Sequence, residues 1–287
     1  MGREGLAAGL PSAAMPIGYQ GEEFSYSHTA AGELFPDGER IGFSTFPAAF
    51  DALVEERVSK LVLPVENSTT GSVLPVLDSL VGGGTRIVGE HYLPVRHAVL
   101  GLPGAKLADL REIHSHPQAL SQCVSWIVHH GVEPIPVHDT AGAVRLVSER
   151  GDPALAALAP PWAAEAHGLE VLATDVMDRA HNTTRFVILE RGEPEITEDA
   201  DKTSLAFETA HRPGALALVL TELGLRGANM TRIESRPTDA AWVYRFFVDL
   251  THPPGPAGYA SVLHPQPATM VAMHHLGSYP VARRPEA

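Results

Sequence analysis

The sequence predicts an α/β protein in which a larger unit of alternating strands and helices is followed by a smaller unit of β-α-β-β order. Between Ile17 and Leu189, short apolar runs alternate with helical stretches, each bounded by Gly, Pro or a capping residue. This spacing is typical of parallel βαβ units. Gly192–Asp201 is acidic and polar and contains Pro194, as expected of a linker. A second, shorter pattern begins with the alternating run Thr203–Thr209.

The strands expected in the larger unit are short runs of apolar and β-branched residues. They are Ile17–Tyr19, Arg40–Phe43, Lys60–Pro64, Ile87–Leu100, Glu112–Ser115, Glu133–Val137, Ala154–Leu158 and Arg185–Leu189. The expected helices each begin at a Pro, Ser or Thr, residues that favour helix starts. They are Ser27–Phe35, Pro47–Glu56, Pro117–His129, Thr140–Glu149 and Pro161–His167.

The smaller unit is expected to have a ferredoxin-like β-α-β-β-α-β order. After the strand Thr203–Thr209, Pro213–Leu225 is expected to be a helix that ends at Gly227. Met230–Ser235 and Trp242–Leu250 are the next strands. The stretch Tyr259–Leu276 should supply the last helix and strand; because prolines crowd residues 253–267, that helix should be short or displaced.

Composition and charge limit the classes of function. The 287 residues suffice for one large or two moderate domains, and no apolar run approaches the roughly 20 residues that span a membrane. A net charge of −13 argues against nucleic acid as a partner. Cys123 is the one cysteine, which fits a reducing compartment, and we expect a cytoplasmic protein. No metal site is expected, because no His-Glu-x-x-His or Cys-x-x-Cys spacing occurs.

The amino-terminal segment differs in character from the rest of the chain. Met1–Ala14 is small and weakly polar, and it lacks the apolar centre of a signal peptide. We therefore expect residues 1–15 to form a disordered extension, with Met15 as a candidate start.

Polar residues gather around the apolar strand at Phe186–Leu189. Thr184 offers a hydroxyl donor, and Arg185 offers a planar fork that suits a carboxylate. Where a strand meets its loop, such a pair can bind a small anion. The alternative, a strand-edge Thr and a surface Arg, is the one that this segment favours on its own.

Three other strand-to-helix corners carry polar or small residues, and such corners can bind anions. The first is Lys60–Val73, where simple helix capping by Ser72 is the alternative. In His114–Cys123, Gln118 and Gln122 lie four residues apart on one helix face. The third is Asp139–Val144. Corners of one kind in a single α/β unit favour a cleft.

In their order along the chain, these motifs resemble the prephenate dehydratase family. The pieces are Pro64-Val65-Glu66-Asn67-Ser68, Gly71-Ser72-Val73, Ser115-His116-Pro117-Gln118-Ala119-Leu120 with Gln122-Cys123, and Thr184-Arg185-Phe186. The later half is similar to the regulatory ACT domain of such enzymes, and Leu276-Gly277-Ser278-Tyr279-Pro280 resembles its closing strand. The loop Tyr19–Ser27 departs from the family pattern, since it lacks the usual Pro and second Gly.

The resemblance implies a domain plan. Residues 16–191 would form a catalytic domain with a two-subdomain architecture like that of periplasmic binding proteins. Its subdomains would be 16–94 plus 180–191, and 95–179. A linker, 192–201, would join it to an ACT domain at 202–282. Because little chain precedes Ile17, we expect no fused chorismate mutase.

The resemblance also implies the reaction, in which prephenate loses carbon dioxide and water and becomes phenylpyruvate. No cofactor is required. Thr184 would assist the leaving hydroxyl and Arg185 would orient a carboxylate or brace the loop. The other residues that the resemblance implicates in catalysis are Asn67, Gln122, Ser115 and, ranked lower, Glu66. The residues expected to bind substrate are Ser68, Gly71, Ser72, Gln118, Thr140, Ala141 and Phe186.

The ACT resemblance implies feedback by L-phenylalanine in a homodimer or homotetramer. The residues expected to bind phenylalanine are Arg212, Pro213, Gly214, Ala215 and Leu216, with Glu234, Ser235, Arg236 and Pro237. A polar strand end is the alternative for Glu234–Pro237. Two other functions stay open for the whole chain: an arogenate dehydratase, and a non-catalytic amino-acid-sensing binding protein.

Overall fold

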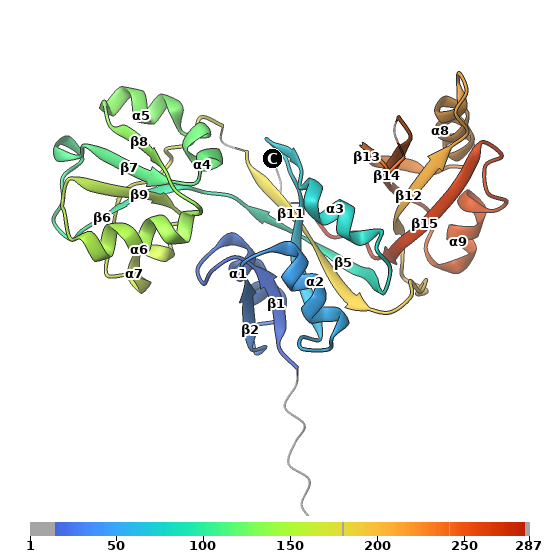
Figure 1. The fold of residues 1–287 in the computed structure, drawn as a ribbon, viewed down its shortest axis with the longest axis horizontal. Helices are drawn as coiled ribbons and strands as arrows, with labels where there is room; N and C mark the ends of the chain where they lie inside the picture. Colours follow the sequence, from blue (N-terminus) through green and yellow to red (C-terminus); the bar gives the residue numbers. More distant parts are fainter. Residues whose placement is uncertain (1–14, 180, 241, 285–287) are drawn as a thin grey trace, which may run out of the picture.

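The computed structural model describes residues 15–179, 181–240 and 242–284. The expectation of disorder for residues 1–14 therefore lies outside the described residues. In Figure 1, three bodies follow one another across the molecule: a subdomain of β6–β10 and α4–α7, a central subdomain, and a carboxyl-terminal unit of β12–β15 with α8 and α9. Within the described residues, no helix is both long and apolar enough to span a bilayer.

The central subdomain is built on a six-stranded sheet of order β2-β1-β3-β11-β5, with β4 paired to β3. The strands are β1 (Ile17–Gln20), β2 (Arg40–Phe43), β3 (Lys60–Asn67), β4 (Gly71–Ser72), β5 (Thr85–Pro94) and β11 (Thr183–Arg191). The helices are α1 (Tyr26–Leu34), α2 (Phe46–Val54) and α3 (Leu74–Leu80). Thr45 caps α2 through a bond from Ala48 N to its hydroxyl, which explains where that helix begins.

The second subdomain is an insertion between β5 and β11. Its five-stranded sheet has the order β10-β6-β9-β7-β8. The strands are β6 (Ala98–Gly101), β7 (Glu112–Ser115), β8 (Glu133–Pro136), β9 (Leu155–Ala159) and β10 (Glu170–Ala173). The helices are η1 (Leu107–Asp109), α4 (Pro117–Ser121), α5 (Val124–His130), α6 (Thr140–Arg150) and α7 (Ala163–Ala166). The two segments that connect this subdomain to the central one lie side by side, because Val95 N donates to Asn182 O at 2.8 Å.

The carboxyl-terminal unit has the expected ferredoxin-like order. Its strands pair as β13-β14-β12-β15. The strands are β12 (Lys202–Thr209), β13 (Asn229–Pro237), β14 (Tyr244–Thr251) and β15 (Met270–Tyr279). The helices are α8 (Ala215–Leu225) and α9 (Gly255–Leu263). The fold class predicted from the sequence is therefore confirmed: two subdomains and then a β-α-β-β-α-β unit.

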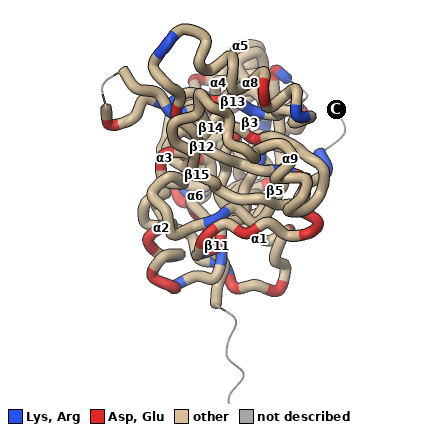
Figure 2. The backbone as a smooth tube through the Cα atoms, turned by 90° about the vertical axis from the view of Figure 1, so that its right-hand side faces the viewer, with Lys and Arg blue, Asp and Glu red and all other residues tan. Residues whose placement is uncertain are grey.

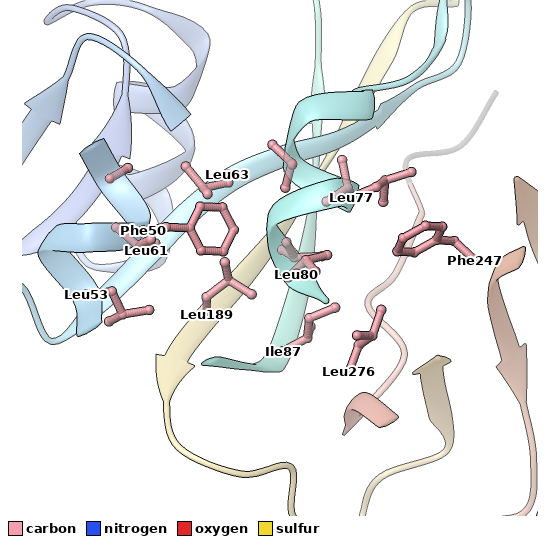
Figure 3. Packing of buried hydrophobic residues seen from close by; sticks show 14 of the residues in the cluster. Phe50, Leu53, Leu61, Leu63, Leu77, Leu80, Ile87, Leu189, Phe247 and Leu276 are labelled. Atoms are coloured by element: carbon pink, nitrogen blue, oxygen red, sulfur yellow. The ribbon is translucent and has the colours of Figure 1, made fainter. Parts of the chain in front are cut away.

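One apolar core continues from the central subdomain into the carboxyl-terminal unit. Figure 3 shows Leu77 and Leu80 of α3 between the strands of the central sheet and Phe247 and Leu276. The two units pack closely at Gly277, where an added Cβ would lie 2.1 Å from the carbonyl oxygen of Ile87. The unit is therefore packed against the central subdomain, beyond its connection through the linker.

Two elements expected as continuous are interrupted. Ile87–Leu100 is not one strand, since Pro94 ends β5 and the next strand, β6, belongs to another sheet. Pro117–His129 is broken at Cys123, whose ψ of 25° and φ of −129° leave the helical region. Asp178 explains the restart of the helix, because its carboxylate accepts hydrogen bonds from Val124 N and Ser125 N.

Other boundaries differ in smaller ways. Ser72 does not start a helix; it lies in β4, and α3 begins at Leu74. The last helix lies at Gly255–Leu263, displaced toward the amino terminus, because prolines occupy its first turn and the segment after it. Figure 2 shows basic and acidic residues interspersed along the tube of the described chain.

Candidate active site

A cleft lies between the two subdomains, with a volume of about 1070 Å³. Asn67 and Thr184 line it from the central sheet, and His116, Gln118 and Thr140 line it from the second subdomain. Asn67 ends β3, Thr184 is the second residue of β11, and the other three stand at the starts of α4 and α6. The polar strand-to-helix corners of the sequence thus converge on one cavity.

Asn67 fixes the position of Thr184. Its Nδ2 donates to Thr184 Oγ1 at 3.0 Å and to Asn182 Oδ1 at 2.7 Å. Its Oδ1 accepts from the backbone N–H groups of Thr69 and Thr70 at 3.0 and 3.1 Å. Thr184 Oγ1 accepts this hydrogen bond and lines the cleft, so its O–H is available there as a donor.

A second amide, Gln122 of the other subdomain, bonds Thr69 and Asn182, which Asn67 also bonds. Its Nε2 donates to Thr69 Oγ1 at 3.2 Å, and its Oε1 accepts from Asn182 Nδ2 at 3.1 Å. Gln118 also crosses the cleft, donating to Thr70 Oγ1 at 2.7 Å. These bonds join the two subdomains around the Thr184 hydroxyl.

The groups next to this network are uncharged near neutral pH. Burial lowers the pKa of His97 to about 4, and its Nε2 lies 3.1 Å from Gln122 Oε1. Burial raises the pKa of Tyr26 well above its ordinary value, and its hydroxyl donates to Arg96 O at 2.6 Å. Burial also lowers the pKa of His116. The Thr184 end of the cleft therefore offers neutral donors.

Arg185 does not share this cavity with Thr184. Successive residues of a strand point to opposite faces, and Arg185 points toward the carboxyl-terminal unit. Its Nη2 lies 2.6 Å from Asp249 Oδ2, and its side chain is 4% exposed. Glu66 is on that side too, 3.8 Å from Arg185 Nη1. The expectation that Thr184 and Arg185 form one anion site is corrected: Thr184 lines the cleft, and Arg185 contacts the carboxyl-terminal unit.

Three more expected residues hold the framework. The Ser115 hydroxyl donates to Leu158 O at 2.5 Å and is fully buried, so it joins β7 to β9 and does not face the cleft. Phe186 belongs to the core under α1, and Ala141 is buried in the first turn of α6. The expectation that these three side chains contact the ligand is therefore corrected to a supporting place.

The β3–β4 hairpin divides its residues between two tasks. Ser68 Oγ accepts from Thr183 N at 3.0 Å and so fastens the hairpin to β11, outside the cleft. Gly71 and Ser72 line the cleft. Ser72 Oγ also donates to Glu234 Oε2 at 2.8 Å, which links the wall of the cleft to β13.

The segments expected to bind phenylalanine lie in the carboxyl-terminal unit. Arg212–Leu216 forms the turn from β12 into α8, and Gly214 there has a φ of +78° that favours glycine. Glu234–Pro237 is the end of β13. Arg236 contacts the central subdomain of its own chain, with Nη2 2.6 Å from Asp78 Oδ2. In the sheet, β14 lies between β13, which carries this segment, and β12, which leads into the turn at Arg212.

Sequence reasoning missed three side chains of the cleft region. Asn182, two residues before Thr184 in sequence, bonds both Asn67 and Gln122, and its proximity was the available signal. Tyr26 and His97 line the cavity beside Gln122. Neither occupies a motif-like setting in the sequence, since α1 and the β5–β6 crossing bring them together.

The fold and the cleft define a class: an α/β protein with two subdomains around a polar cavity and a ferredoxin-like unit after them. A family model described as prephenate dehydratase matches residues 17–194. The chain belongs to the prephenate dehydratase family.

Several relatives support this assignment. Arogenate dehydratase/prephenate dehydratase 1 of Arabidopsis thaliana is 43% identical over 223 residues, covering 77% of this chain and 57% of that protein. The chain thus spans under two thirds of the length of this relative. A bifunctional N-acyl-homoserine lactone acylase/prephenate dehydratase of Komagataeibacter europaeus is 37% identical, covering 84% of this chain and 87% of that one. The prephenate dehydratase of Arthrobacter aurescens, solved in complex with L-Phe, has a TM-score of 0.80 at 30% identity, covering 95% and 92% of the two chains.

Proposed function

We propose that this chain is a prephenate dehydratase that converts prephenate to phenylpyruvate, carbon dioxide and water. The observation that carries the proposal is the hydroxyl of Thr184, whose oxygen accepts a hydrogen bond from Asn67 and which lines the cleft. Membership of the family and the neutral donors around the hydroxyl support it.

The chemistry requires assistance at one end of the substrate. The bond from the ring to its carboxylate carbon breaks, its electron pair enters the ring, and the opposite ring hydroxyl leaves with the electron pair of its own C–O bond. The departing hydroxide takes up a proton, so prephenate and one proton give phenylpyruvate, carbon dioxide and water. The Thr184 hydroxyl donates a hydrogen bond to the leaving oxygen, where negative charge develops. Acid assistance of this kind contributes about 10²–10⁴-fold to a rate.

The surroundings of Thr184 suit that role. Asn67 and Gln122 are themselves fixed by Thr69 and Asn182, so the hydroxyl is held in place before substrate arrives. Uncharged His97 and Tyr26 place no cation near a leaving hydroxide, so no competing anion is attracted to this end.

Substitution of Thr184 tests the proposal. We expect Thr184→Ala to lower kcat by 10²-fold or more with little change in KM, and Thr184→Ser to keep most of the activity. Thr183→Ala is the matched control, because Thr183 is the neighbouring residue and does not line the cleft. Phenylpyruvate is measured by its absorbance in alkali. A Thr184→Ala variant with kcat within a few-fold of wild type would contradict the role.

Arogenate dehydration is the second candidate, because several relatives of 40–43% identity are described as arogenate dehydratases. Side-by-side turnover of prephenate and arogenate decides between them. The Komagataeibacter relative adds deacylation of an N-acyl-homoserine lactone as a further arm of the same assay. A chain that binds an aromatic amino acid in the cleft and turns over none of these substrates would be the non-catalytic sensor.

We further propose that the carboxyl-terminal unit is an ACT domain through which L-phenylalanine regulates the enzyme. Its β-α-β-β-α-β order supports this, as do the bonds from Ser72 to Glu234 and from Arg236 to Asp78, which connect β13 to the cleft wall and α3. Coupling between two such sites is reciprocal. Calorimetry with phenylalanine should give binding heat and a thermal shift. The absence of both signals at millimolar phenylalanine would contradict the proposal.

An assembly of two or four chains accompanies this regulation. Leu218 and Leu225 of α8 are 54% and 84% exposed, and Ile233 of β13 is 46% exposed. Apolar side chains on neighbouring elements supply a surface that a second copy would cover. Light scattering with and without phenylalanine tests the oligomeric state.

The buried lone Cys123 supports a reducing compartment such as the cytoplasm.

A further inference from the structure

Among the described residues that line the cleft, Arg40 is the one Lys or Arg. A carboxylate ligand therefore has a single full positive charge to meet there. The carboxylates on the cleft wall have other tasks: Glu22 is ion-paired with Arg145, and Asp139 Oδ1 accepts from Gly142 N at 2.6 Å. Glu23 is exposed on the loop after β1. The chain's net charge of −13 does not attract anions, so a local cation matters.

Arg40 has no competing partner in the part of the chain that the structure describes. It lies on β2, paired in register with Ile17, and its side chain forms no ion pair or hydrogen bond within those residues. Its guanidinium lies against α1 at Gly32, where an added Cβ would come within 2.1 Å of Nη1. The absence of a side chain at Gly32 therefore makes room for the charged end, and the five N–H donors of the fork remain available.

Tyr19 adds a neutral donor next to this cation. Its ring is 2% exposed, its hydroxyl forms no hydrogen bond within the described residues, and it lines the same cleft. Gly42 makes room for it, because an added Cβ would lie 3.0 Å from the Tyr19 oxygen. Burial raises the pKa of Tyr19, so the phenol keeps its proton. Ile17 and Tyr19 pair with Arg40 and Gly42, and residues two apart share a strand face, so the two donors are set by adjacent strands.

We propose that Arg40, with Tyr19 beside it, binds the carboxylate of the substrate's three-carbon side chain. This inference rests on the proposed function. The ring carboxylate leaves as carbon dioxide, and a guanidinium paired with it would stabilise the charge that must be lost. The side-chain carboxylate stays charged from substrate to product, so binding it leaves the barrier unchanged and raises affinity. Prephenate and arogenate share this group.

The test is steady-state kinetics of Arg40→Gln with prephenate and with arogenate. We expect KM for the substrate that is used to rise about 10–100-fold, since charge-assisted hydrogen bonds are lost, while kcat stays within about threefold. Inhibition by phenylpyruvate, which keeps the same carboxylate, should weaken by a similar factor. Arg111→Gln is the control for charge, because Arg111 is an exposed arginine paired with Asp152.

A second variant protects the test against misfolding. Gly32→Ala displaces the guanidinium but keeps its charge, and alanine is favoured over glycine within a helix. It should raise KM without lowering stability. If wild type converts neither substrate, the proposed function fails and the inference fails with it. If wild type is active and Arg40→Gln and Gly32→Ala both leave KM and phenylpyruvate inhibition within twofold, the inference alone is overturned.

Discussion

The substitution Asp249→Asn tests the ion-pair network that joins the central subdomain to the carboxyl-terminal unit. Asp249 is 2% exposed, with Oδ2 2.6 Å from Arg185 Nη2 and 3.8 Å from Arg232 Nη1. Burial acts to raise the pKa of Asp249, but Arg185, Arg232 and Lys202 outweigh it, and the net pKa is lowered. The carboxylate is therefore charged at neutral pH and balances more than one cation.

The size of the effect follows from what the substitution leaves behind. An amide of the same shape keeps the packing but leaves buried guanidinium groups without a counter-charge, and breaking a buried pair in this way costs about 3–5 kcal/mol. Glu90 offsets part of this, since its Oε2 lies 3.7 Å from Arg185 Nε and 2.7 Å from Lys202 Nζ. We therefore expect the free energy of unfolding to fall by about 3 kcal/mol.

The assay is urea denaturation followed by circular dichroism at pH 7. Asp239→Asn is the matched control, because Asp239 is an exposed carboxylate of the same unit. We expect a midpoint near that of wild type for the control and a clearly lower one for Asp249→Asn. A loss below about 1 kcal/mol in Asp249→Asn would show that the network does not stabilise the contact between the two units.

Two further predictions concern pH and packing. Burial lowers the pKa of His97 from 6.5 to about 4, so the stability linked to this group is complete above pH 6.5 and decreases by about 3 kcal/mol as the pH falls to 4. His97→Gln should therefore reduce the change of the urea midpoint between pH 7 and 4.5. A variant whose midpoint changes with pH as much as that of wild type would refute this. Gly277→Ala should destabilise the protein by 1–3 kcal/mol, because its Cβ would lie 2.1 Å from Ile87 O; thermal unfolding measures this, and a melting temperature within 1–2 °C of wild type would contradict it.

The order of elements could be predicted from sequence because strands and helices alternate with clear punctuation. Apolar periodicity and helix-starting residues suffice for that, and β2 and β7 match to the residue. The breaks could not be predicted, since they depend on distant partners. The α4–α5 break needs Asp178, which lies 54 residues beyond Val124 in the chain.

The residues of the site also differ in how far local sequence patterns indicate them. Asn67, Gln118, Gln122, Thr140 and Thr184, which sequence corners or strand ends pointed to, all line one cavity in the structure. Arg185 was misplaced because the face toward which a strand residue points depends on register and neighbours. Arg40 had no motif around it; α1 and β2 must fold together before its charge faces the cleft.

The insertion of the second subdomain between β5 and β11 bears on how this chain can be re-engineered. Its entry and exit are held together by the bond from Val95 N to Asn182 O, so the segment leaves and re-enters the central body at one place. Segments with adjacent ends are the ones that tolerate transplantation. The subdomain can therefore be treated as a cassette: a relative's version could replace it while Thr184, the Arg185–Asp249 contact and the carboxyl-terminal unit stay as they are. Chimeras of this kind would exchange one wall of the cleft and leave the Ser72–Glu234 and Arg236–Asp78 bonds intact.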